Sequence, residues 1–149
     1  MFDGDYYMEG IMKDNNCIFC KLANGDIPTT TIFEDEDFRV IPDAGPASFG
    51  HLLIIPKEHH QDLTELPEAT AAKVLPLAAR LGRAMKASLG CAGFNVVQNN
   101  GAAAGQTVMH FHVHLIPRYE GGEPMVVWKP GTLEPEKARE IAEKMGAVL

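Results

Sequence analysis

The chain has 149 residues, of which 46% are hydrophobic and 22% charged, and its formal net charge is −7. Such a length and composition are typical of one globular domain with its own core. The acidic balance argues against a nucleic-acid polymer as ligand, because phosphate backbones select basic surfaces, but it is compatible with a small nucleotide in a locally positive pocket. No apolar run approaches the roughly 20 residues of a membrane-spanning helix, so we expect no membrane partner.

The first 15 residues are acidic and show no periodicity. We expect a flexible tail over residues 1–15 and one domain over residues 16–149. The start of the chain lacks the basic flank and apolar core of a signal peptide, which predicts a cytoplasmic protein with reduced cysteines. An odd number of cysteines that includes a Cys-x-x-Cys pair fits a metal site better than a disulfide framework.

That pair consists of Cys17 and Cys20. Two thiolates at this spacing can hold zinc from one turn, and the ion then needs two further ligands. The candidates are His59 and His110, with His51 and His60 as competitors. The alternatives are a redox pair and two unconnected thiols. A redox pair is expected at a strand–helix junction in a βαβ unit, which this sequence does not show.

Short runs of β-branched and apolar residues between turn residues predict several strands. The strands are expected over residues 30–34, 38–42, 50–56, 94–98 and 108–117, with a short strand or arm over 125–128.

Apolar residues at helical spacing predict a long helix over residues 67–89, which Gly90 is placed to end. Pro76 lies inside this pattern and predicts a bend or a late start. A second helix is expected over residues 134–147, with Pro135 in its first turn. Strands that follow one another as hairpins around one long helix indicate an antiparallel α+β domain.

Asp43 follows the second strand, ahead of an Ala-Gly-Pro turn. A carboxylate beside a glycine turn can accept two hydrogen bonds from ribose hydroxyls. The residues alone favour the simpler interpretation, in which Asp43 caps its own loop as an Asx turn.

The run His-Phe-His-Val-His-Leu-Ile occupies residues 110–116. Strand alternation places His110, His112 and His114 on one face and their apolar neighbours in the core. Imidazole serves as nucleophile, general acid–base or metal ligand near neutral pH. The spacing alone leaves three alternatives open: catalysis, a metal site made of the three histidines, and a polar face covered by a partner.

A turn rich in hydrogen-bond donors precedes this run. Gly105 lets backbone N–H groups approach an anion closely, and Gln106 and Thr107 add side-chain donors. A neutral histidine beside a phosphate held there could attack the phosphorus and form a phosphohistidine. The chain has no Walker-type phosphate loop and no obvious carboxylate pair for magnesium.

Together these motifs resemble the histidine-triad nucleotide-binding family, close to its zinc-containing phosphoramidase branch. The resemblance runs from about Cys17 to Tyr119. It implies a homodimer in which two five-stranded antiparallel sheets join into one, with a nucleotide pocket in each subunit. The matching segments are Cys-Ile-Phe-Cys at 17–20, Gly-His-Leu-Leu-Ile-Ile-Pro-Lys-Glu-His at 50–59, Asn-Asn-Gly at 99–101, Gly-Gln-Thr at 105–107 and the histidine run at 110–116.

The resemblance implies that His112 attacks the α-phosphate of a nucleoside phosphoramidate, such as an AMP-amine or AMP-lysine. A nucleotidyl-histidine forms, the amine leaves, and water releases the nucleoside monophosphate, AMP or GMP. His114 would hydrogen-bond the phosphate or orient the reacting groups, and Asp43 would hold the ribose. The residues implied to position the phosphate oxygens are Asn99, Gly105, Gln106 and Thr107.

In similar proteins zinc is held at the positions of Cys17, Cys20, His59 and His110, which leaves His51 in a polar network behind the site. We expect zinc loss to destabilise the fold and to lower activity indirectly.

Two other functions stay open. Hydrolysis of dinucleoside polyphosphates, as in the fragile-histidine-triad branch, is less favoured because that branch usually lacks the Cys-x-x-Cys pair. A nucleotide-binding interaction protein with incidental catalysis is less favoured because the triad is intact. Uridylyl transfer is disfavoured because the transferase branch uses His-Pro-His-Gln, where this chain has Val113 and Leu115. Ile41 and Phe38 are candidates for the apolar wall of the base pocket.

Overall fold

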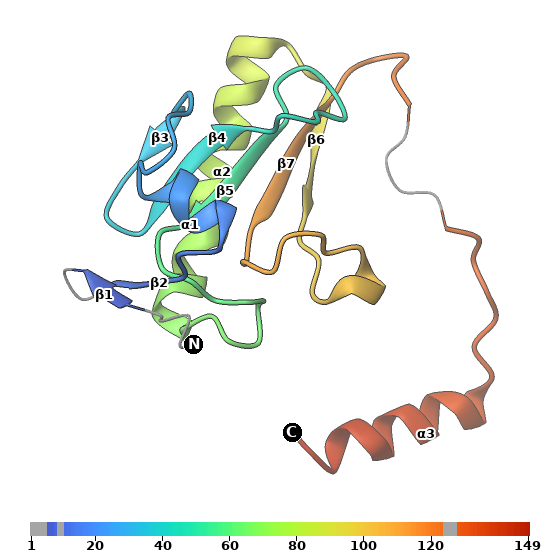
Figure 1. Cartoon of the computed structure of the whole chain (residues 1–149). Helices are drawn as coiled ribbons and strands as arrows, with labels where there is room; N and C mark the ends of the chain where they lie inside the picture. The colour runs from blue at the N-terminus through green and yellow to red at the C-terminus, as the bar shows by residue number, and fades with distance from the viewer. Residues whose placement is uncertain (1–5, 9–10, 124–127) are drawn as a thin grey trace.

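The computed structural model describes residues 6–8, 11–123 and 128–149. Within them lies a five-stranded antiparallel sheet with the strand order β3-β4-β5-β7-β6 (Figure 1). This sheet confirms the predicted α+β class. Its strands are β3 (Phe33–Glu34), β4 (Phe38–Pro42), β5 (Leu52–Pro56), β6 (Gly93–Val97) and β7 (Val113–Arg118).

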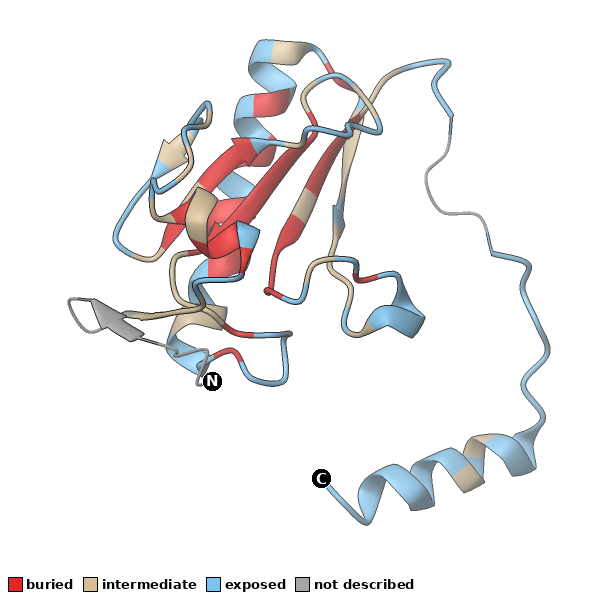
Figure 2. Cartoon of the chain, in the orientation of Figure 1, coloured by how far each residue is buried: buried red, intermediate tan, exposed pale blue. Residues whose placement is uncertain are grey.

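Helices cover both faces of this sheet. The short α1 (Ile18–Ala23) contacts β4 and β5, and the long α2 (Glu68–Leu89) contacts β6 and β7. A single 3₁₀ turn, η1 (Ala102–Ala104), lies in the loop between β6 and β7. The C-terminal helix α3 (Pro135–Gly146) has no buried residue (Figure 2).

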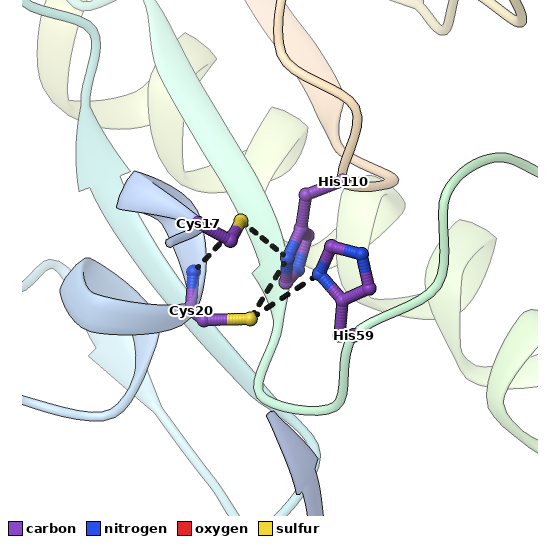
Figure 3. A group of neighbouring side chains, drawn as sticks. All are labelled: Cys17, Cys20, His59 and His110. Carbon is purple, nitrogen blue, oxygen red and sulfur yellow. Dashed lines mark hydrogen bonds between the residues drawn. The ribbon is translucent and has the colours of Figure 1, made fainter. Parts of the chain in front are cut away.

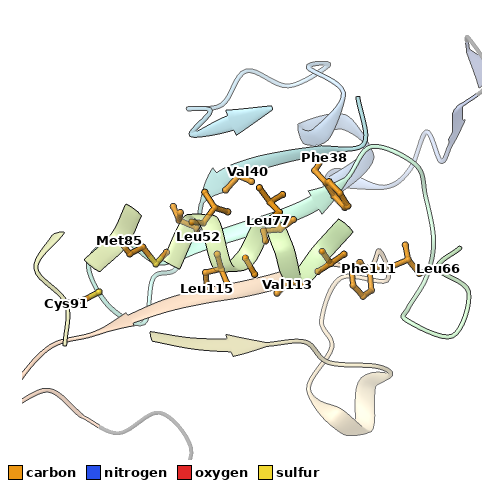
Figure 4. Packing of buried hydrophobic residues seen from close by; sticks show 14 residues of the cluster. Phe38, Val40, Leu52, Leu66, Leu77, Met85, Cys91, Phe111, Val113 and Leu115 are labelled. Carbon is orange, nitrogen blue, oxygen red and sulfur yellow. The ribbon is translucent and has the colours of Figure 1, made fainter. Parts of the chain in front are cut away.

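The period of two along the strands divides the core into two clusters. Phe38, Leu52 and Val113 belong to the cluster that packs against α2, and Figure 4 shows its members between the sheet and that helix. Ile41 and Leu53 belong to the second cluster, on the α1 face. The two candidates for the pocket wall therefore lie on opposite faces, because Phe38 and Ile41 differ by an odd number of residues.

The long helix begins at Glu68 and continues through Pro76, so of the bend or late start predicted there the late start does not occur and the bend stays a prediction. Proline has no N–H, so the carbonyl four residues earlier has no hydrogen-bond donor within the helix. That carbonyl belongs to Ala72, which is exposed like Pro76 and so can be hydrated. The helix ends as predicted at Gly90, whose φ of 68° is left-handed.

The histidine strand begins later than its alternation predicts. β7 starts at Val113, and the N–H of Phe111 donates to the carbonyl of His60 (2.7 Å) rather than to a neighbouring strand. Only His114 therefore lies on the strand, where it pairs with Leu53. His110 and His112 precede the strand, but the alternation holds: Phe111, Val113 and Leu115 pack in the core against α2 as predicted. The imidazoles face the α1 side, where Phe19 meets the rings of His110 and His112 and the ring of His114 lies beside that of His112.

Two short strands lie in the predicted tail. β1 (Tyr6–Met8) and β2 (Ile11–Lys13) pair in antiparallel fashion, and the carbonyl of Met12 accepts a hydrogen bond from the N–H of His59 (2.9 Å). The tail over residues 1–15 and the domain boundary at residue 16 stay predictions. The short strand expected over 125–128 lies, apart from Trp128, outside the described residues. None of the helices in the described ranges is long and apolar enough to cross a membrane.

Candidate functional site

Two thiols and two imidazoles converge between α1 and the end of β5 (Figure 3). The Nδ1 atom of His110 lies 3.4 Å from the Sγ atoms of both Cys17 and Cys20, and Nδ1 of His59 lies 3.3 Å from Sγ of Cys20. The structure thus brings together the four residues predicted as metal ligands, and the competing His51 and His60 lie outside this group.

The local fold of α1 orients the two sulfur atoms. Cys17 is the N-cap, and its Sγ accepts a hydrogen bond from the N–H of Cys20 (3.4 Å). The N–H of Asp14 donates to Sγ of Cys20 (3.4 Å). The hydrogen bond with Cys20, and next the contact with His110, lower the pKa of Cys17. The hydrogen bond to the Cys17 sulfur and burial raise the pKa of Cys20.

The imidazole of His110 is held in the tautomer that a metal ligand needs. Its Nε2 lies 2.9 Å from the carbonyl oxygen of Pro56, and because a carbonyl can only accept, Nε2 carries the proton. The lone pair is therefore on Nδ1, which faces both sulfurs. A ligating histidine whose other nitrogen donates to a backbone carbonyl is the usual outer-shell arrangement of metal sites. Two thiolates and two imidazoles are a tetrahedral donor set that suits zinc.

A second group of possible ligands consists of Asp43, His51 and His114. Nε2 of His51 lies 2.9 Å from Nδ1 of His114 and 3.3 Å from Oδ2 of Asp43. In this group, however, the N–H of Ala47 donates to Nδ1 of His51 (3.0 Å). A metal on Nε2 would require His51 to lose both ring protons, so hydrogen bonding rather than a metal holds this group together.

Asp43 has two distinct contacts. Its Oδ1 accepts a hydrogen bond from the N–H of Gly45 (2.8 Å), which is the Asx turn that the residues alone favoured. Its Oδ2 faces the imidazoles of His51 and His114, at 3.3 and 3.5 Å. The same carboxylate therefore closes its loop and presents a charge to the histidine group.

A cavity of about 310 Å³ lies over this end of the sheet, on the α1 side. Its polar lining includes Asp43, Thr107, His112 and His114, and its apolar wall includes Ile41. The volume is within the usual range of small-molecule sites. Phe38, the other candidate for this wall, packs in the core against α2 instead.

The imidazole of His112 is also held in one tautomer. Its Nδ1 donates to the carbonyl of His110 (2.7 Å), which leaves the lone pair on Nε2. Burial lowers the pKa of His112, and burial together with the neighbouring His112 and His51 lowers the pKa of His114 to about 4. Both imidazoles are therefore neutral near pH 7, and His112 has a free nitrogen for nucleophilic attack.

The loop before the histidines is braced by its own glutamine. Oε1 of Gln106 accepts from the N–H of Gly101 (2.7 Å), and Nε2 donates to the carbonyls of Gln61 (2.7 Å) and Val108 (3.0 Å). Its side chain is thus occupied within the protein. Asn99, Gly105 and Gln106 do not line the described cavity, whereas Thr107 does. Of the phosphate-positioning residues predicted from sequence, the structure places only Thr107 at the cavity.

Three residues at the site escaped the sequence analysis. Phe19, between the two cysteines, meets the ring of His112 edge-on with a centroid distance of 4.8 Å. Ala47 and Pro56 act through backbone groups that fix the tautomers of His51 and His110. Side-chain patterns do not predict a backbone contact. Phe19, however, lies inside the Cys-x-x-Cys motif, and this position could have identified it.

A five-stranded antiparallel sheet with His114 on an inner strand, and with His110 and His112 directly before that strand, is the arrangement expected of a histidine-triad protein. The family model described as the HIT domain matches residues 24–121, and the chain belongs to this family. The resemblance noted from the sequence is thereby confirmed.

Similar proteins include an enzyme and crystal structures. The adenosine 5′-monophosphoramidase of Schizosaccharomyces pombe is 36% identical over 133 residues, which cover 89% of this chain and 97% of the relative. A crystal structure of a HIT family protein from Bacillus anthracis has a TM-score of 0.83 at 38% identity, covering 91% of this chain and 98% of that one. A zinc-bound histidine-triad protein from Mycobacterium smegmatis has a TM-score of 0.69 at 36% identity, covering 89% and 97%.

Proposed function

We propose that the protein is a nucleotide-binding hydrolase that cleaves nucleoside 5′-phosphoramidates of the AMP-amine or AMP-lysine type. The observation that carries the proposal is the hydrogen bond from Nδ1 of His112 to the carbonyl of His110, which leaves a neutral Nε2 nucleophile at the cavity. The similarity to a monophosphoramidase supports a phosphorus–nitrogen bond as the one that is cleaved.

In the proposed reaction, Nε2 of His112 attacks the α-phosphorus while the phosphorus–nitrogen bond breaks. A proton from solvent is transferred to the substrate nitrogen as this bond breaks, so the neutral amine leaves with the bonding electron pair. Nδ1 keeps its proton throughout, so the nucleotidyl-imidazole is cationic and the carbonyl of His110 stabilises its charge. Water then attacks the phosphorus and releases a proton to solvent, the phosphorus–Nε2 bond breaks with its electron pair returning to Nε2, and the nucleoside monophosphate leaves with neutral His112 restored.

The other cavity residues position the substrate in this proposal. Thr107 and His114 hydrogen-bond phosphate oxygens, and Asp43 accepts hydrogen bonds from the ribose hydroxyls. Gly105 and Gln106, which the resemblance implied as phosphate contacts, act by shaping the loop that presents Thr107, and the phosphate contact of Asn99 stays a prediction. The shaping role follows from the internal hydrogen bonds of Gln106 and the left-handed φ of 92° at Gly105. Ile41 faces the base.

We further propose that the Cys17–Cys20–His59–His110 group holds zinc. When bound there, the ion supplies structural cross-linking rather than reaction chemistry, because all four ligands come from the protein. It ties α1 to the segment that leads into β7. The carbonyl of His110, which orients His112, thereby gains a fixed position.

We also propose a homodimer formed at the β6 side of the sheet. β6 is an edge strand of the described sheet. Next to it lies an apolar hollow of about 270 Å³, whose lining includes the exposed side chains of Leu63, Leu75 and Val96. An open strand edge beside an apolar surface is suited to a second copy of the chain.

The reduced thiols are consistent with a cytoplasmic location.

The test is turnover of a fluorogenic adenosine 5′-phosphoramidate beside diadenosine tetraphosphate, by wild type and His112→Ala. We expect rapid AMP release from the phosphoramidate, reduced on the order of 10³-fold or more by the substitution, as for removal of a covalent nucleophile. AMP binding to His112→Ala controls for folding. A preference for the dinucleotide would indicate the polyphosphate branch. AMP binding without turnover of either substrate would indicate a nucleotide-binding interaction protein.

A further inference from the structure

We propose that His51 is a positioning residue that fixes the tautomer of His114, and that the backbone N–H of Ala47 sets the direction of this hydrogen-bond chain. The inference deepens the proposed function, because His114 is a substrate-orienting group there. It concerns the ground state of the free protein, however, and so has a test that needs no substrate.

The first group in this series of hydrogen bonds can act only as a donor. The backbone N–H of Ala47 lies 3.0 Å from Nδ1 of His51 and can only donate. Nδ1 of His51 must therefore accept, and the neutral ring carries its proton on Nε2. His51 is 5% exposed, and burial lowers its pKa against the opposing effect of Asp43, so the ring stays neutral near pH 7.

The tautomer of His51 determines the tautomer of His114. The Nε2–H of His51 donates to Nδ1 of His114 at 2.9 Å and lies 3.3 Å from Oδ2 of Asp43. Nδ1 of His114 is therefore an acceptor, and its proton is on Nε2. His114 lines the cavity beside His112, with ring centroids 5.0 Å apart. It thus offers substrate a hydrogen-bond donor, which suits a phosphate oxygen.

The opposite arrangement of protons is unfavourable at both ends. With the proton of His51 on Nδ1, two N–H groups would face each other at Ala47. The Nε2 lone pair would then face the carboxylate oxygen of Asp43 and, unless His114 also changed tautomer, the lone pair of its Nδ1. A buried imidazole with no acceptable partner on either nitrogen is strongly disfavoured.

The turn that carries Ala47 is itself held in place. The N–H of His51 donates to the carbonyl of Ser48 (3.2 Å), and the hydroxyl of Ser48 donates to the carbonyl of Pro117 in β7. Gly50 has a left-handed φ of 91°, and a Cβ there would lie 2.4 Å from a methyl carbon of Leu89. The left-handed φ favours glycine at this position of the turn. The turn that contains the Ala47 donor is therefore hydrogen-bonded to β7, the strand that carries His114.

The experiment measures histidine tautomers by ¹⁵N-detected NMR on uniformly labelled full-length protein. We expect His114 of the wild type to be protonated on Nε2. In His51→Asn the shorter side chain still accepts from Ala47 but does not reach His114, so we expect a mixture of tautomers. In His51→Gln the amide N–H occupies the position of the imidazole Nε2–H, so we expect the wild-type tautomer to return.

Activity gives a second measurement. With the phosphoramidate, we expect kcat of His51→Asn to fall on the order of tenfold or more with KM within a few-fold, and His51→Gln to recover most of kcat. A wild-type His114 protonated on Nδ1, or a tautomer unchanged in a folded His51→Asn, overturns the inference. If neither variant folds, the wild-type tautomer decides alone. Absence of turnover bears on the proposed function only, because the tautomer assignment does not depend on it.

Discussion

The Cys17–Cys20–His59–His110 group and the Asp43–His51–His114 group are both compact, with the possible ligand atoms of each group within 4.8 Å of one another. They differ in the backbone group that each histidine meets. His110 donates to the carbonyl of Pro56 and so presents a lone pair to the thiols. His51 accepts from the N–H of Ala47 and so presents a proton. One peptide group thus decides whether convergent side chains suit a cation or a hydrogen-bond relay.

The largest expected effect comes from removing a ligand of the first group. His59→Ala is expected to lose the proposed zinc and to lower Tm by about 10 °C or more, because metal binding and folding are coupled. Activity should fall with it, although His59 does not line the cavity with His112. Metal content by mass spectrometry and Tm by calorimetry are the measurements. His60→Ala, at the adjacent buried histidine outside the group, is the matched control. Unchanged metal content and Tm in His59→Ala would remove the basis for a structural zinc site.

The second prediction concerns the number of metal ions. We expect one zinc per chain in the wild type and the same number in His51→Asn, because the second group cannot bind a cation without a doubly deprotonated His51. Titration of the metal-free protein with zinc, followed by calorimetry, measures both numbers. A second equivalent that binds the wild type tightly and is lost in His51→Asn would show that the two groups do not differ as their hydrogen bonds indicate.

Much of this difference between the two side-chain groups could not be predicted from the sequence. The Cys-x-x-Cys spacing identified Cys17 and Cys20, but spacing could not choose His59 and His110 from four histidines, and the family resemblance made that choice. Strand alternation predicted one row of imidazoles over residues 110–114. The side on which these residues lie is as predicted, but the strand begins only at Val113, because the N–H of Phe111 bonds to the carbonyl of His60, far away in sequence.

The parts that local patterns determine were predicted more closely. The apolar spacing of α2 and the left-handed Gly90 placed the long helix to within one residue of its observed start and at its observed end. The Asx turn at Asp43 also depends on neighbours in sequence and was anticipated. The roles of Ala47 and Pro56 depend on which backbone group approaches which nitrogen across the fold. No pattern of side chains encodes such a contact.

The smallest expected effect is a pH dependence of stability that belongs to the second group. Burial, and then His112 and His51, lower the pKa of His114 to about 4 from the ordinary 6.5, against an opposing effect of Asp43. Between these two values the unfolded chain binds more protons than the folded one, so the free energy of unfolding falls as pH falls from 6.5 toward 4. The loss is on the order of 2 kcal/mol at pH 5.

His114→Asn lacks this titrating group, so its loss of stability between pH 7 and pH 5 should be smaller than that of the wild type by this amount. Urea unfolding at both pH values measures the difference. Protonation of the zinc ligands affects both proteins equally and cancels in the comparison. An identical loss in the two proteins would mean that His114 is not held neutral by its surroundings. The ring could then carry a proton on both nitrogens, and the lone pair that is expected to accept from His51 would not exist.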